Sequence, residues 1–136
     1  MSSQTLLYRV QWGDTDAAGI VFYPNYFRWF DHAGHEFLRR VGLPVEMLMR
    51  QYQTALPIIE VGCRFHQPVR YNDSLTIETA ITEVRTRSFR FEHRVSRDGA
   101  ITGIGFDVRV WTRPTGEKND TFELAAIPDE VRAHLL

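Results

Sequence analysis

Four stretches from residue 58 onward carry patterns typical of β-strands. They cover residues 58–67, 75–82, 89–95 and 104–110, and apolar side chains alternate with polar ones most clearly in 75–82 and 89–95. Asp98-Gly99, between the last two stretches, is a hairpin turn signal because both residues tolerate a positive φ. We also expect a first strand over residues 6–12 and an edge strand over residues 122–126.

One long helix is predicted from about residue 24 or 25 to residue 41. Pro24 suits the first turn, and Gly42 offers a left-handed stop. Apolar residues recur at spacings of three and four, which puts them on one stripe of the helix. The residues of this stripe are Tyr26, Phe30, Ala33, Phe37 and Val41. Shorter helical segments are expected over residues 45–52 and 128–136.

The order of these elements predicts an α+β fold. The apolar stripe of the long helix must be buried, and the sheet offers the only surface large enough to cover it. An antiparallel sheet wrapped around one long central helix is the hotdog fold. With 136 residues the chain fits a single domain, residues 1–136.

Composition narrows the possible partners and the compartment. The net charge of −1 argues against a general nucleic-acid-binding role or an anionic-membrane role. The amino terminus is polar and no long apolar run follows, so we expect no signal peptide and no membrane span. Cys63 is the single cysteine, which fits the reducing cytoplasm, and we interpret it as a passive strand residue.

The candidate chemistry lies in the glycine-bounded loop of residues 13–19, which contains Asp14 and Asp16. This loop ends close to the start of the long helix, where backbone N–H groups lack partners and carry partial positive charge. Such donors stabilise an oxyanion, and a nearby carboxylate can attack or accept a proton. Spacing alone, however, favours two loop aspartates that make turn hydrogen bonds.

Other chemistries lack the residues that they need. The Asp14 segment begins like a calcium loop, but Ala18 and Asn25 occupy two ligand positions. His32 and His35 lie one helical turn apart without an evident third zinc ligand, so no metal is expected. There is no serine-hydrolase elbow and no phosphate-binding Walker loop.

Residues 12–26 read WGDTDAAGIVFYPNY and are followed by RWFD at 28–31. This segment resembles the signature of the 4-hydroxybenzoyl-CoA thioesterase family, and the order of elements agrees over nearly the whole chain. The resemblance implies a hotdog-fold enzyme that hydrolyses an acyl-CoA thioester to the free acid and CoA. CoA is then part of the substrate, and no separate cofactor is implied.

The resemblance also implies roles for particular residues. Asp16 matches the catalytic aspartate, as nucleophile or general base, and the backbone N–H of Tyr23 is implied to polarise the thioester carbonyl. Asp14 would shape the loop. Gly19 would permit a turn or a close approach of substrate.

The expected acyl group is aromatic, of the benzoyl or hydroxybenzoyl type. Phe22-Tyr23-Pro24-Asn25 resembles the aromatic-substrate branch of the family, in which the position of Asp31 faces the ring substituent. Leu56 stands where the 4-hydroxybenzoyl enzyme has threonine, so other ring substituents are equally compatible. A short-chain aliphatic substrate, a non-catalytic acyl-CoA-binding module and a hydratase are the alternatives. The hydratase lacks its usual histidine, because Val21 lies five residues after Asp16.

Arg85, Arg87 and Ser88 lie at the join between two predicted strands and are candidates to bind the phosphates of CoA. The resemblance places an arginine-rich turn there. A lone hotdog sheet has exposed edges. The resemblance implies that two copies join their sheets edge to edge and that dimers pair into tetramers, with the site at the dimer interface. The arginine cluster could then serve a neighbouring subunit's substrate.

Overall fold

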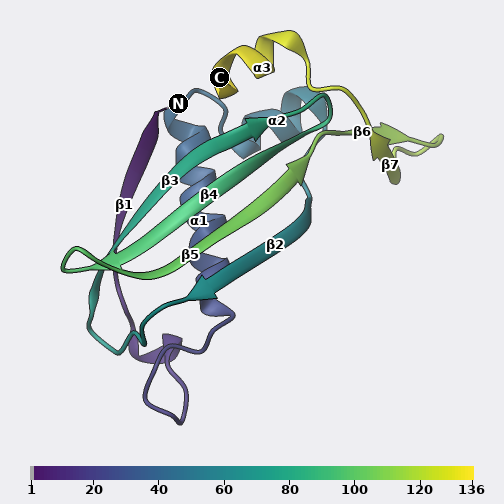
Figure 1. Cartoon of the computed structure of the whole chain (residues 1–136). Coiled ribbons are helices and arrows are strands. Elements are labelled where there is room, and N and C mark those ends of the chain that lie inside the picture. Colours follow the sequence, from purple (N-terminus) through teal and green to yellow (C-terminus); the bar gives the residue numbers. More distant parts are fainter. Residues whose placement is uncertain (1) are drawn as a thin grey trace.

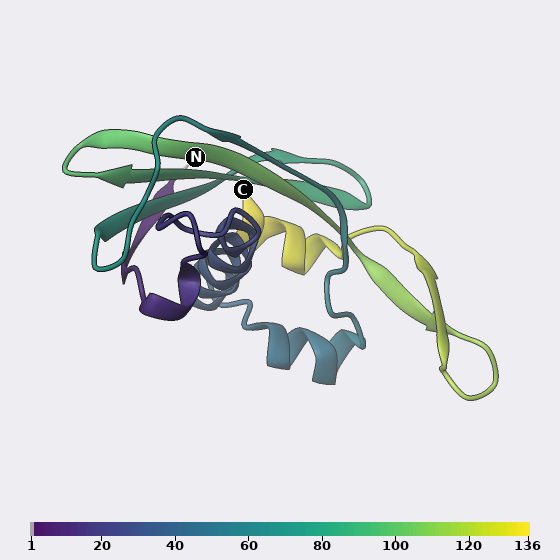
Figure 2. The same ribbon diagram turned by 90° about the horizontal axis from the view of Figure 1, so that it is seen from below.

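Five antiparallel strands form one curved sheet in the order β1-β3-β4-β5-β2, and α1 lies across one face of it (Figure 1). The computed structural model describes residues 2–136. The main elements are β1 (Ser3–Arg9), α1 (Asn25–Arg40), α2 (Val45–Tyr52), β2 (Ile58–Phe65), β3 (Ser74–Val84), β4 (Ser88–Arg97), β5 (Ala100–Val110), β6 (Thr112–Thr115), β7 (Thr121–Leu124) and α3 (Asp129–Leu135). The predicted α+β arrangement, a sheet wrapped around one long helix, is confirmed (Figure 2).

The limits of α1 agree with the local signals in the sequence. Pro24 precedes the first helical residue with φ −62°, and Gly42 lies two residues beyond the helix end with φ +88°. The predicted apolar stripe faces the sheet, and Tyr26, Phe30 and Phe37 are at most 4% exposed. Asp98 and Gly99 both have positive φ in the turn between β4 and β5, as predicted.

Two strand predictions differ from the structure in their limits or their sheet. The first strand ends at Arg9, and Trp12 begins a short 3-10 turn (Trp12–Asp14). Trp12 itself is 75% exposed. The turn forms because Gln11 N–H and the Asp14 carboxylate bond to each other, which bends the chain away from the sheet. The predicted edge strand at 122–126 is β7, which pairs with β6 in a separate hairpin that projects from the body (Figure 1).

The inward face of β5 does not consist of its largest apolar residues. Residues 103, 105, 107 and 109 are buried, whereas Ile104, Phe106 and Val108 are only partly buried on the other face. Glycine is required at position 105, because an added Cβ would lie 2.3 Å from Phe30 Cε2. The helix therefore packs closely on β5, and the remaining inward positions on this strand are the charged Asp107 and Arg109.

The core consists of two clusters along α1. One contains Phe37, Phe91 and Trp111 and joins the end of α1 to α2 and α3. The other contains Tyr26, Phe30 and their neighbours and supports the start of α1. No helix in the described residues 2–136 is long and apolar enough to cross a membrane.

Candidate active site

Asp14 anchors the loop that precedes α1. Its side chain is buried, and Oδ2 accepts hydrogen bonds from Tyr8 Oη at 2.6 Å and from Gln11 N at 2.8 Å. The backbone carbonyl of Asp14 accepts from Phe22 N and from Asn25 Nδ2, both at 2.8 Å. Burial, and then the hydrogen bond to Asp14, raise the pKa of Tyr8, so its hydroxyl remains a donor. One aspartate thus ties β1, the loop and the start of the helix together.

Asp16 lies in a tight turn and is exposed. Its Oδ1 accepts from Ala18 N at 2.8 Å, and its backbone N donates to Ile20 O at 3.0 Å. Gly19 closes the turn with φ +79° and donates to Asp16 O at 2.9 Å. Within residues 2–136 the other carboxylate oxygen, Oδ2, makes no hydrogen bond to protein. It is available to water or substrate.

A backbone donor without an acceptor lies at the start of α1. Asn25 N donates to Phe22 O, and Tyr26 N donates to Tyr23 O. Pro24 has no N–H, and the Tyr23 N–H has no hydrogen-bond acceptor among the described residues. An N–H group at this end of a helix adds to the positive end of the helix dipole. It is suited to an oxygen that develops negative charge.

The loop holds Asp16 beside the segment that leads to Tyr23. Thr15 and Val21 form an antiparallel bridge, and Phe22 N donates to Asp14 O. A pocket of about 280 Å³ adjoins this segment. Its lining includes Val21, Tyr23, Tyr26, Phe65 and Val69. The structure therefore places the Tyr23 N–H beside a mainly apolar pocket, and the exposed Asp16 carboxylate lies in the loop that leads to it.

Asp31 lies farther along α1, about 12 Å beyond Tyr23 at the rise of a helix. Its side chain is 51% exposed, and Oδ1 accepts a hydrogen bond from Arg109 Nη2 at 2.7 Å. His35 Nε2 is 3.6 Å from the same oxygen. Arg109 was not predicted as a site residue, because alternation with Ile104, Phe106 and Val108 places it on the polar face of the expected strand.

Arg85, Arg87 and Ser88 lie in or beside the turn between β3 and β4, at the opposite end of the sheet from the Asp16 loop (Figure 1). A single chain does not bring the two groups together. Arg85 Nε is 2.6 Å from Glu83 Oε1, and Arg87 is exposed. Arg85 and Ser88 line a polar pocket of about 230 Å³.

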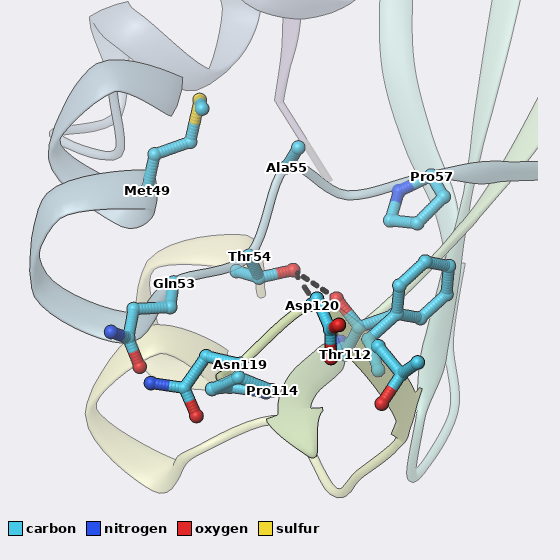
Figure 3. Close-up of a pocket in the computed structure, with 11 residues that line it drawn as sticks. Met49, Gln53, Thr54, Ala55, Pro57, Thr112, Pro114, Asn119 and Asp120 are labelled. Atoms are coloured by element: carbon cyan, nitrogen blue, oxygen red, sulfur yellow. Dashed lines mark hydrogen bonds between the residues drawn. The ribbon is translucent and has the colours of Figure 1, made fainter. Parts of the chain in front are cut away.

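Another pocket, of about 410 Å³, lies between α2 and the β6–β7 hairpin (Figure 3). Met49, Pro57 and Phe122 line it, and a hydrogen bond of 2.9 Å between the Thr54 and Thr112 hydroxyls lies at its wall. None of the predicted site residues lines this pocket. It is separate from the Asp16 loop.

Burial raises the pKa of the Cys63 thiol to about 11. A thiol with this pKa is protonated at neutral pH and is a poor nucleophile. This agrees with the interpretation of Cys63 as a passive strand residue.

Comparison with known proteins identifies one family. Residues 18–104 match the model of the thioesterase superfamily. The chain is 35% identical over 131 residues to 4-hydroxybenzoyl-CoA thioesterase of Pseudomonas sp. strain CBS-3, covering 91% of this chain and 93% of that protein.

Two solved structures are also similar over nearly their full lengths. The chain superposes on a mutant of 4-hydroxybenzoyl-CoA thioesterase complexed with 4-hydroxybenzoyl-CoA, with a TM-score of 0.89 and 31% identity, covering 98% of this chain and 99% of that one. A gentisyl-coenzyme A thioesterase is 36% identical with a TM-score of 0.82, covering 97% of this chain and 98% of that one.

Proposed function

Because the chain belongs to the thioesterase superfamily and is an acyl-CoA thioesterase, we propose that its substrate is an aromatic acyl-CoA ester. The observation that carries the proposed site is the unpaired Tyr23 N–H, in the same loop as the exposed Asp16 carboxylate. The aromatic assignment is supported by the relatives named above, two of which act on hydroxylated benzoyl esters by name. The aromatic residues of the adjoining pocket, Tyr23, Tyr26 and Phe65, also support it.

In the proposed reaction the thioester carbonyl oxygen accepts a hydrogen bond from Tyr23 N–H. Two routes then lead to the same products. In one, an Asp16 carboxylate oxygen bonds to the carbonyl carbon, the carbon–sulfur bond breaks, and CoA leaves as a thiolate that water protonates. Water then hydrolyses the mixed anhydride. In the other, Asp16 takes a proton from the water that attacks the carbonyl carbon, the carbon–sulfur bond breaks, CoA leaves as a thiolate that receives this proton, and no anhydride forms.

Single-turnover hydrolysis in heavy-oxygen water tests for the anhydride. Attack by Asp16, followed by attack of water on the Asp16 carbonyl of the anhydride, predicts labelled oxygen in the Asp16 carboxylate, detected by mass spectrometry of the peptide that contains it. General-base catalysis predicts label in the product acid alone, and so does attack of water on the acyl carbonyl of an anhydride, so label in Asp16 is the result that demonstrates its attack. The Ala18 N–H bond to Oδ1 leaves Oδ2 as the oxygen for either role.

We infer that two copies complete the site by pairing their β2 strands. β2 is an edge strand, and Ile58, Ile59, Val61 and Phe65 on it are each more than 40% exposed. Such an edge is an association surface. Antiparallel pairing of two β2 strands would set the Asp16 loop of one chain near the β3–β4 turn of the other, where Arg85, Arg87 and Ser88 would bind CoA phosphates. Pairing of two such dimers gives the proposed tetramer.

A panel of acyl-CoA esters tests the proposed function through release of free thiol. Benzoyl-CoA and its hydroxylated derivatives should be hydrolysed at a higher kcat/KM than acetyl-, butyryl- and hexanoyl-CoA. A preference for the aliphatic esters would contradict the aromatic assignment. Binding without thiol release would indicate an acyl-CoA-binding module, and loss of the double bond of an enoyl-CoA without thiol release would indicate a hydratase.

A further inference from the structure

A buried arginine on β5 bonds through all of its guanidinium nitrogens. Arg109 is 2% exposed. Its Nε donates to Asp107 Oδ2 at 3.0 Å, its Nη1 to Leu56 O at 3.2 Å, and its Nη2 to Asp31 Oδ1 at 2.7 Å. The planar fork thus connects the inner face of β5, the segment before β2 and the helix α1. Such a planar fork sets the direction from which each acceptor bonds, in addition to supplying a positive charge.

The base of this fork is itself fixed. Asp107 Oδ1 is 2.6 Å from Nε2 of His93, and Nδ1 of His93 is 2.8 Å from Thr79 Oγ1. The His93 ring is fully buried and stacks on Phe30, with centroids 4.6 Å apart and an interplanar angle of 6°. Because a carboxylate only accepts, Nε2 of His93 carries a proton. These contacts leave Asp107 one orientation and hold Arg109 in place.

Leu56 adopts a strained backbone conformation at this contact. It is 1% exposed and has φ +53°, a conformation that is costly for a residue with a Cβ. In this conformation its carbonyl receives Arg109 Nη1. The surroundings therefore specify the position of the guanidinium.

Asp31, at the end of this network, is the member that solvent reaches. The side chains of His93, Asp107 and Arg109 are at most 3% exposed, whereas that of Asp31 is 51% exposed. Both neighbours of the Asp31 carboxylate, Arg109 and His35, contact Oδ1. Within residues 2–136, Oδ2 has no hydrogen-bond donor. A carboxylate oxygen is an acceptor, so Oδ2 favours a hydrogen-bond donor over an anion.

We propose that Arg109 is a positioning residue that determines acyl specificity. It holds the Asp31 carboxylate so that Oδ2 accepts a hydrogen bond from a neutral hydroxyl or amino substituent on the aromatic ring. This rests on the proposed function, because it places the ring of an aromatic acyl-CoA along α1. The resemblance to the family implied a role for Asp31 alone, and the Arg109–Asp107–His93 support follows from the contacts.

The test measures a substrate ratio that a loss of stability does not change. The ratio is kcat/KM for the best of the three hydroxybenzoyl-CoA isomers divided by that for its methoxy analogue, with benzoyl-CoA as a second reference for size. The wild-type ratio should be on the order of 10 or more, because a site built to bond a hydroxyl rejects an analogue without that donor. Asp31→Ala should reduce it to about 1.

Arg109→Lys keeps the charge but loses the fork, and Arg109→Gln loses both. Each should reduce the ratio toward that of Asp31→Ala, and Arg109→Lys added to Asp31→Ala should change it no further. The matched control is Arg113→Gln, which removes an exposed arginine that pairs with Glu123 on the β6–β7 hairpin. The control should leave the ratio at its wild-type value. If Arg109→Gln does not fold, the test rests on Arg109→Lys and on the double variant that combines it with Asp31→Ala.

A hydroxyl preference that persists in the Arg109 variants would overturn the proposal and leave a purely structural role for the network. So would a wild-type enzyme that hydrolyses hydroxylated and methoxylated esters equally well. Failure of the proposed function is recognisable separately, because the wild-type enzyme would then release thiol from aliphatic esters and from none of the aromatic ones. That result would also overturn the role of Arg109.

Discussion

Asp14 and Asp16 lie two positions apart and have opposite environments. Asp14 is 5% exposed and receives two hydrogen bonds that close the loop onto β1. Asp16 is exposed and is held only by bonds within its own turn. A buried, bonded carboxylate contributes to stability, whereas a carboxylate with a free oxygen at the surface can react. At the scale of single residues, the loop therefore contains one carboxylate that supports the fold and one that is free to react.

Asp14→Ala should lower the free energy of unfolding by about 1–3 kcal/mol, because Tyr8 Oη and Gln11 N lose their common acceptor. Asp16→Ala serves as the matched variant and should leave stability almost unchanged. Urea denaturation of the two variants measures the difference. Equal stability of the two variants would show that the Asp14 contacts do not support the loop.

At the scale of elements, the local periodicity of apolar residues predicted α1, β3 and β4. The stripe of α1 and the alternation of β3 and β4 identify their buried faces, because each such face is mainly apolar. On β5 the prediction is harder, since Ile104, Phe106 and Val108 are the apolar set while glycines and charged residues face the helix. Only the close packing of α1 on β5 explains that choice, and close packing is not a local property.

The residues of the candidate site also form two groups, one that the sequence predicted and one that only the fold shows. Asp16, Gly19 and Tyr23 lie within eight consecutive residues, so a sequence signature identified them together. The Arg109–Asp31 contact joins residues 78 positions apart. No spacing rule connects such residues, and only the fold shows that they meet. Trp12 was misassigned because its alternation with Val10 continues past the end of β1.

Gly105→Ala tests the close packing of α1 on β5. An added Cβ would lie 2.3 Å from Phe30 Cε2 and 2.7 Å from Gly62 O, so the backbone or the ring must move. We expect a loss of about 1–3 kcal/mol in unfolding free energy, as for other overpacked cores. Gly13→Ala is the matched control, because an added Cβ there meets nothing within 4 Å. Similar melting temperatures for both variants would contradict the packing described.

At the scale of the whole molecule, the two proposed halves of the site lie at opposite ends of the sheet of one chain. The Asp16 loop and Tyr23 lie at one end, and Arg85, Arg87 and Ser88 lie at the other (Figure 1). Association through β2 would unite the two halves from different chains. An edge strand with four exposed apolar residues gives a physical reason for that association.

Mixing two inactive variants tests the composite site. One chain carries Asp16→Asn, and the other carries Arg85→Ala with Arg87→Ala. In a mixed dimer one of the two sites has both halves intact. Random association of equal amounts should therefore restore about a quarter of wild-type activity at low substrate concentration. No recovery on mixing, or full activity of the arginine variant alone, would contradict a site shared between chains.

The central claim is that the Asp16 carboxylate performs the chemistry of thioester hydrolysis. Asp16→Asn is the sharpest change, because the amide oxygen can still accept from Ala18 N while the negative charge is removed. Asp120→Asn is the matched control, since it neutralises an exposed carboxylate in the loop between β6 and β7.

The measurement is thiol release from the best aromatic acyl-CoA, together with the affinity for that ester by calorimetry. We predict that Asp16→Asn lowers kcat by about a hundredfold or more while the ester still binds, and that Asp120→Asn changes neither value. Near-normal turnover by Asp16→Asn would contradict the account.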